Sequence, residues 1–204
     1  MNPAFSVIFL TTLIGAGQGL FVALFMAHLG GLALIDQGVA SFLVLGGMVV
    51  LALTALGLVA SFFHLGRPER AWRTATMWRT SWLSREVIVL PLFMGGVLVW
   101  TVLQVTGRGG TWLALGVGLL TLLACMALFV CTAMIYASVR FLQEWASAYT
   151  LINYGLLGLA SGFTLATALS PFGAPGLAPF FGISAILFTL AGLVSRALSL
   201  RRVL

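Results

Sequence analysis

Six long apolar stretches constrain the fold of this chain more than any other feature of its sequence. They cover roughly residues 5–29, 38–64, 86–106, 111–137, 151–170 and 180–200. Each is near or above the roughly 20 residues that a helix needs to cross the hydrocarbon core of a bilayer. Only a helix lets such a span satisfy its own backbone hydrogen bonds there. We therefore predict an all-α integral membrane protein, a polytopic bundle of six transmembrane helices in which residues 1–204 form a single transmembrane anchor domain.

The composition agrees with a bilayer as the solvent of this chain. It is 61% hydrophobic and 7% charged, whereas soluble domains carry about 25% charged residues. The formal charge is +6, and all ten basic residues are arginines. Because they lie in loops between apolar spans, they are expected to set topology and to meet lipid headgroups or a protein partner, not nucleic acid.

The arginines are distributed unequally between the two sides of the predicted bundle. With six spans, the N-terminus, the 65–85 loop, the 138–150 loop and the C-terminus share one side. That side holds Arg67, Arg70, Arg73, Arg79, Arg85, Arg140, Arg196, Arg201 and Arg202. The other side holds only Arg108. This asymmetry predicts a multi-pass protein of the bacterial inner membrane, with the N-terminus and the 65–85 loop in the cytoplasm.

A histidine and a glutamate bracket the most highly charged loop, which begins "FFHLGRPERAWR". His64 closes the second span and Glu86 opens the third, so both are expected at one membrane face. A favourable charge at a helix end is one interpretation of each. The other is a proton-exchanging pair beside lipid, where ionisable groups are costly and mark functional sites. Such a pair, with Arg67 from the same loop, would suit the headgroup of a quinone.

Other polar residues in the loop and the spans have simpler interpretations. The loop's tryptophans and arginines anchor helices at headgroup depth or contact a partner. Gln18 is expected to form an interhelical hydrogen bond. Tyr136 is either an interfacial belt residue or reaches the charged face. Arg140 and Glu144 are interpreted as a surface pair on a helix.

Haem and metal cofactors are not expected in this chain. No stretch has the ligand spacing of a zinc or iron–sulfur site. The two histidines, His28 and His64, end the first two spans on opposite faces. They would be about 30 Å apart, so they cannot be the two axial ligands of one haem.

Three stretches together resemble the membrane anchor subunits of the dimethyl sulfoxide reductase family, most of all the branch found in quinone-linked sulfite dehydrogenases. They are "NPAFSVIFLTTLIGAGQGLF", "FHLGRPERAWR" followed by "SWLSRE", and "CTAMIYASVRFLQEW". The resemblance extends over essentially the whole chain. Members of the family usually have eight spanning helices, so this chain is either a shorter variant or lacks the last helices.

The resemblance implies a three-subunit oxidoreductase in which this chain is the anchor and not the catalytic centre. A catalytic subunit would carry a molybdenum bis-pterin cofactor, and a ferredoxin-like subunit would carry four iron–sulfur clusters. The anchor would exchange electrons with ubiquinone or menaquinone at His64 and Glu86, with Arg67 inferred to join them. Arg70, Arg73, Arg79 and Arg85 would then dock the iron–sulfur subunit.

The predicted orientation favours sulfite oxidation with quinone reduction, because the sulfite-oxidising relatives are thought to face the cytoplasm. A quinol-oxidising anchor of a dimethyl sulfoxide reductase is the first alternative. A purely structural tether is the second. A small transporter or channel is disfavoured, because the middles of the spans offer little beyond Gln18, threonine and serine.

Overall fold

The computed structural model describes residues 5–31, 37–63 and 68–202. Within these ranges it contains six long helices and no strand, which confirms the predicted all-α fold. The helices are α1 (Phe5–Gly31), α2 (Gln37–Phe62), α3 (Trp82–Val105), α4 (Trp112–Ala137), α5 (Ala148–Leu169) and α6 (Ala178–Arg201). All six are long and apolar enough to cross a membrane, so the chain is a multi-pass membrane protein.

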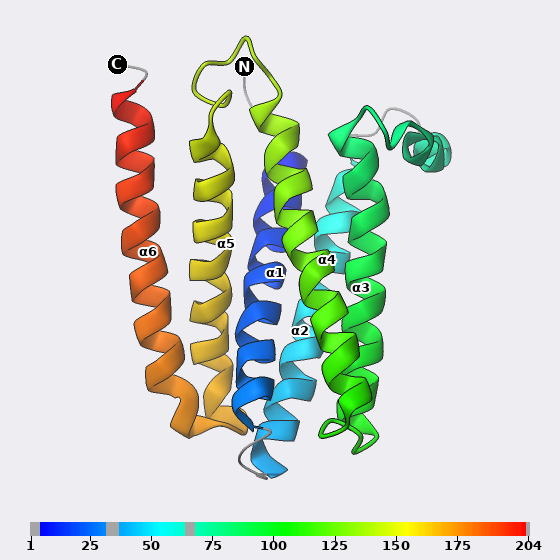
Figure 1. Ribbon diagram of the computed structural model, residues 1–204, viewed down its shortest axis with the longest axis vertical. Helices are drawn as coiled ribbons and strands as arrows, with labels where there is room; N and C mark the ends of the chain where they lie inside the picture. The colour runs from blue at the N-terminus through cyan, green and yellow to red at the C-terminus, as the bar shows by residue number, and fades with distance from the viewer. Residues whose placement is uncertain (1–4, 32–36, 64–67, 203–204) are drawn as a thin grey trace.

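The helices run side by side, with α1 in the middle (Figure 1). Helix α1 packs against α2, α4 and α5, α3 pairs with α4, and α6 packs mainly on α5. The N-terminal end of α1, the 138–147 loop and the C-terminal end of α6 lie together at one end of the bundle. We call it the Arg-rich end, because every described arginine except Arg108 belongs to it. The opposite end, formed by the 106–111 and 170–177 connections, is the Arg108 end.

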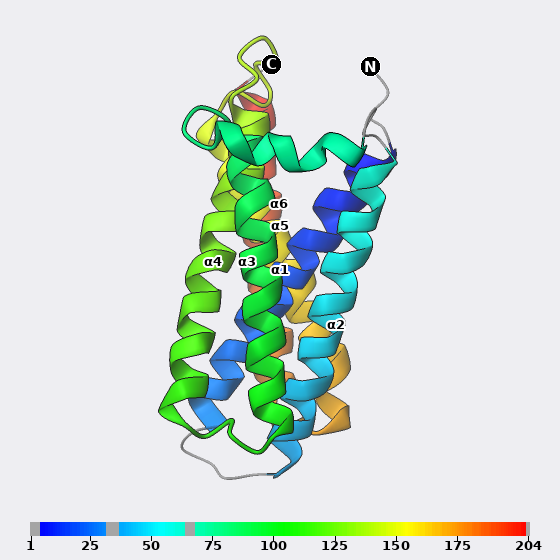
Figure 2. The ribbon, with the colours of Figure 1, turned by 90° about the vertical axis from the view of Figure 1, so that its right-hand side faces the viewer.

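A short helix covers part of the Arg-rich end. The segment η1 (Pro68–Met77) is a 3₁₀ helix that lies across the bundle between the ends of α2 and α3 (Figure 2). A proline that follows a glycine closely in a sequence is most often part of a turn that ends a helix. Proline is well tolerated at the first position of a helix, where its missing N–H is not needed, so Pro68 begins this helix instead. Arg73 therefore lies on a helix that runs across the end of the bundle.

Helix α3 begins earlier than its apolar stretch does. Ser81 has an extended backbone, and its side chain accepts a hydrogen bond from the Ser84 N–H at 3.4 Å. A serine in this position is a favoured N-cap. The helix therefore starts at Trp82 rather than at Glu86. Glu86 does not open the helix, as the sequence suggested, but lies a full turn inside it.

The contact between α1 and α5 is made by glycines. A Cβ added to Gly162 would overlap the backbone of Gly19, and one added to Gly19 would overlap the carbonyl of Gly158. The two backbones therefore touch, which is the usual way in which small residues bring helices together in a membrane. These three glycines therefore allow α1 and α5 to pack closely.

Hydrogen bonds between helices stabilise the same region. The fully buried Gln18 of α1 donates from Nε2 to the carbonyl of Cys125 on α4 at 2.9 Å. The Cys125 thiol donates back to the Gln18 carbonyl at 3.6 Å. Tyr154 of α5 donates to the Thr11 carbonyl at 3.3 Å and lies 3.4 Å from Gln18 Oε1. The interhelical interpretation of Gln18 is thus confirmed, and its side chain joins three helices.

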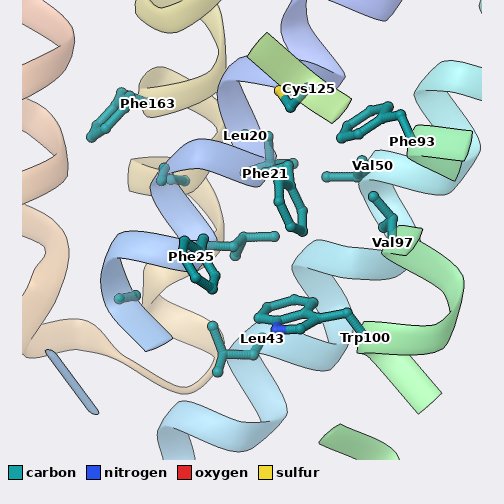
Figure 3. Packing of buried hydrophobic residues seen from close by; sticks show 14 of the residues in the cluster. Leu20, Phe21, Phe25, Leu43, Val50, Phe93, Val97, Trp100, Cys125 and Phe163 are labelled. Carbon is teal, nitrogen blue, oxygen red and sulfur yellow. The ribbon is translucent and has the colours of Figure 1, made fainter. Parts of the chain in front are cut away.

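Aromatic side chains fill the space between α1 and α3 (Figure 3). The ring of Phe21 meets Phe93 edge-on at 5.6 Å between centroids, and Trp100 at 5.5 Å. All three are fully buried. In a membrane, burying an apolar side chain between helices gives no hydrophobic gain, because lipid is equally apolar. The bundle depends instead on packing contacts, to which edge-to-face aromatic pairs contribute.

His28 closes the Arg108 end of the bundle. Trp100 Nε1 donates to His28 Nδ1 at 3.2 Å, so the ring proton lies on Nε2, which donates to the Gly109 carbonyl at 2.9 Å. The histidine thereby ties α1 to α3 and to the turn before α4. The Nδ1 lone pair accepts the hydrogen bond from Trp100, and Nε2 carries the proton that it donates to Gly109. Neither ring nitrogen therefore offers a free lone pair to a metal.

The glycine contact predicts a strong dependence of stability on residue size. We expect Gly162→Ala to lower the free energy of unfolding by about 1–3 kcal/mol or more, because the added methyl group forces two backbones apart. Gly155→Ala in the same helix is the matched control, since a Cβ there meets open space. Thermal unfolding of both variants in detergent provides the measurement. Equal melting temperatures for the two would contradict the assigned contact.

Candidate functional site

Glu86 is a buried acid near the Arg-rich end. Its side chain is only 8% exposed and points from α3 to α4, where Thr132 Oγ1 donates to Glu86 Oε1 at 2.5 Å. Thr132 is itself 2% exposed. A carboxyl group within an apolar helix pair is costly and calls for a functional explanation. The alternative interpretation, a charge that stabilises the first turn of α3, is weakened because the acid lies beyond that turn.

Side chains from two further helices surround this carboxyl group. Cys131 and Tyr136 of α4 and Tyr154 of α5 lie within range of the charge that an ionised Glu86 would carry. Thr132 and Tyr136 are four residues apart, so they lie on one face of α4. Since Tyr154 also reaches Gln18, a run of polar side chains leads from Glu86 into the interior of the bundle.

Sequence reasoning named Glu86 and Tyr136 but missed Thr132 and Tyr154. The available signal for Thr132 was its spacing of four residues from Tyr136 in "CTAMIY". Nothing in the sequence pointed to Tyr154, because its place beside Gln18 is set by the glycine contact between α1 and α5.

His64 and Arg67, the other two predicted quinone-site residues, lie outside the described residues. Their proximity to Glu86 therefore stays a prediction. The structure describes the chain on both sides of them. Helix α2 ends at Phe62, at the Arg-rich end, and η1 follows from Pro68. Helices α2 and α3 touch at Gly47 and Thr101 and diverge from there toward the Arg-rich end (Figure 2).

The four predicted docking arginines have different surroundings. Arg85 is half-buried: its Nε donates to the Trp78 carbonyl and its Nη2 to the Arg79 carbonyl, both at 3.0 Å. Its guanidinium also lies 4.2 Å from the centre of the Trp82 ring. Arg85 therefore holds the turn before α3 together. Arg73 and Arg79 are exposed, and the side chain of Arg70 lies outside the described part of the structure.

A polar cavity opens at the Arg-rich end between α4, α5 and α6. Its volume is about 210 Å³, and it is lined by Tyr136, Glu144, Trp145, Thr150, Asn153, Arg196 and Ser199. The interpretation of Arg140 and Glu144 as a helical pair is wrong, because α4 ends at Ala137 and residues 138–147 form turns. Glu144 instead lies on the wall of this cavity.

An apolar groove lies at the same end between α1 and α2. Its volume is about 450 Å³, and its lining is Ser6, Phe9, Leu13, Leu56, Val59, Ala60 and Phe63. The last of these residues directly precedes His64 in the chain. The groove is thus lined by the residue that directly precedes the charged segment in the sequence.

No group of three or more histidine, cysteine, aspartate or glutamate side chains gathers to form a metal site among the described residues. Glu86 and Glu144 are the acids whose side chains the structure describes. Glu86 is bonded to Thr132 between α3 and α4, whereas Glu144 lies on the wall of the polar cavity.

Comparison with known proteins identifies the relatives of this chain. Residues 1–203 match the family described as DMSO reductase anchor subunit (DmsC). The chain is 53% identical to the C subunit of sulfite dehydrogenase from Allochromatium vinosum, over 99% of its own length and 66% of that protein. It is 29% identical to anaerobic dimethyl sulfoxide reductase chain YnfH of Escherichia coli, over 75% of its own length and 54% of that protein. The chain thus spans less than two thirds of the length of either relative. No solved structure matches it.

The hydrogen bond to Glu86 predicts how substitutions of Thr132 behave. We expect Thr132→Val to lower the free energy of unfolding by about 1–3 kcal/mol, because it leaves a buried carboxyl group without its donor. Thr132→Ser keeps the hydroxyl group and is the matched control. Thermal unfolding in detergent measures both. If the valine variant is as stable as the serine variant, the hydroxyl group is not what stabilises the buried acid.

Proposed function

The chain belongs to the family of dimethyl sulfoxide reductase anchor subunits, and on that basis we propose that it is the quinone-reactive membrane subunit of a molybdenum oxidoreductase. It would pass electrons between a ferredoxin-like iron–sulfur subunit and the quinone pool. The observation that carries this proposal is the buried carboxyl group of Glu86 at the Arg-rich end. A structural tether has no use for such a group, whereas quinone chemistry moves protons with electrons.

The residues of the Arg-rich end fit a quinone in two respects. The apolar groove along α1 and α2 suits an isoprenoid chain, because it is lined almost wholly by aliphatic and aromatic side chains. It leads to Phe63, so the next residue, His64, is well placed in the sequence to contact the headgroup. Quinone, when bound, supplies a two-electron, two-proton couple. In this proposal His64 and Glu86 hold or move its protons, and Arg67 orients its carbonyl oxygen.

The exposed arginines support docking of a partner on the same end. Arg73 lies on η1 and Arg79 on the turn after it, and both are exposed at the Arg-rich end. An iron–sulfur subunit bound there would bring a cluster close to the quinone. We assign Arg70 the same docking function, because it belongs to η1. Arg85 would support docking indirectly, because its guanidinium binds the carbonyl groups of the turn that carries Arg79. The molybdenum catalytic subunit would bind through the iron–sulfur subunit.

We further propose sulfite oxidation with quinone reduction as the reaction of the complex. The support is the 53% identity to a protein named as the C subunit of a sulfite dehydrogenase, together with the arginine asymmetry that assigns the Arg-rich end to the cytoplasm. A quinol-oxidising dimethyl sulfoxide reductase is the second candidate. It is supported by the weaker similarity to chain YnfH.

Substitution of the proton-exchanging pair tests the quinone proposal. We expect Glu86→Gln, and separately His64→Ala, to lower quinone-linked turnover of the assembled complex by roughly a hundredfold or more, because each removes a group that exchanges protons. Dye-linked turnover by the catalytic subunit is the internal control and should keep its normal rate. Normal quinone turnover in both variants would leave a structural tether as the better assignment.

Labelling of single cysteines tests the proposed orientation in the inner membrane. In a background where Cys125 and Cys131 are replaced by alanine, Arg108→Cys should react with an impermeant maleimide in intact spheroplasts. Arg140→Cys, at the other end of the bundle, should react only after lysis. Both arginines are exposed in the structure, so access to the side chain itself does not limit the reaction. The reverse labelling pattern would place the Arg-rich end outside the cytoplasm.

A further inference from the structure

The polar cavity between α4, α5 and α6 is lined by one buried amide whose oxygen atom is not paired within the described part of the chain. Asn153 is only 8% exposed and lines the cavity, and its Oδ1 has no hydrogen-bond partner among the described residues. Buried polar atoms in native proteins are bonded, and ordered water is the usual partner when no side chain serves. With a volume of about 210 Å³, the cavity is large enough for several water molecules.

The cavity extends from the exposed Glu144 to Tyr136, on the helix that carries the hydrogen-bond donor of Glu86. Its outer wall includes the exposed Glu144 of the 138–147 loop, and its inner wall includes Tyr136. Tyr136 lies within range of a charge on Glu86. It also lies one helical turn from Thr132, whose hydroxyl group donates to the Glu86 carboxyl group.

Taking the proposed quinone reaction as given, we propose that this cavity is the proton port of the site. Protons would enter from water at the Arg-rich end and pass by way of the Tyr136 hydroxyl group to Glu86. Reduction of one quinone consumes two electrons from the iron–sulfur subunit and two protons from this side, and quinol oxidation releases them by the same route. Asn153 would hold the water, and Tyr136 would be a relay residue.

The arrangement of charge around Glu86 is consistent with such a route. The titratable groups within range of a charge on Glu86 are Cys131 and Tyr136 from α4 and Tyr154 from α5, and Arg85 is its neighbour in the chain on α3. Of these, Tyr136 lines the cavity. Tyr154 is bonded to α1 and so belongs to the interior of the bundle. The path to water therefore passes Tyr136.

The test compares variants of the assembled complex in membranes. Tyr136→Phe removes the hydroxyl group and keeps the ring, which packs edge-on against Trp145 at 5.4 Å. We expect at least about a tenfold fall in quinone-linked turnover, which is less than the loss on removing an acid or base itself, because water can replace a hydroxyl relay in part. The solvent isotope effect on turnover should rise, and the fall should be greatest at alkaline pH, where protons are scarce. Tyr149→Phe, outside the cavity, is the matched control and should change none of these.

A second variant tests the same route independently, in case Tyr136→Phe does not fold correctly. Asn153→Leu fills the place of the water with an apolar side chain and should likewise raise the solvent isotope effect while dye-linked turnover stays normal. If both variants match Tyr149→Phe in rate and isotope effect while Glu86→Gln is slow, the quinone site stands and the port is refuted. If Glu86→Gln also turns over normally, the proposed function fails, and the port fails with it.

Discussion

The contact of glycine backbones between α1 and α5 is the constraint on which the rest of the bundle depends. It places Tyr154 beside Gln18, and Gln18 in turn binds the backbone of α4. Helix α4 then supplies the hydroxyl group that satisfies Glu86 on α3. Without water in the hydrocarbon, each of these polar groups needs a partner from another helix. Close approach of two helices thus positions the polar groups of four.

The sequence predicts the spans well because membrane thickness, rather than tertiary contact, sets their length. It fails where charge interrupts an apolar run. Arg85 and Glu86 made the third span appear to start at Glu86, although the Ser81 cap begins the helix at Trp82. Glu86 was identified by its cost in lipid, but its partner Thr132 and the cavity beside Tyr136 were not. Both depend on which helices pack against each other. The six spans are similarly apolar, so no local sequence pattern shows which of them become neighbours.

The structure also separates arginines that look alike in the sequence. Arg79 is exposed, whereas Arg85 binds two carbonyl groups and stacks on Trp82. Both carry the same charge and both contribute to the asymmetry that orients the protein. Only a planar guanidinium can make the contacts of Arg85, since the ammonium of lysine lacks the planar fork. The arginines at this membrane face therefore differ in function. All contribute to the charge asymmetry, but Arg85 also stabilises the backbone of the turn before α3.

Helix α6 is attached to the bundle on one side. It packs mainly on α5, and only 17% of its most apolar 18-residue stretch is buried inside the protein. Yet this helix supplies Arg196 and Ser199 to the polar cavity. That wall therefore belongs to the least buried of the six described spans. Lateral pressure from acyl chains, or the arrival of another helix against α6, would act first on the width of the cavity.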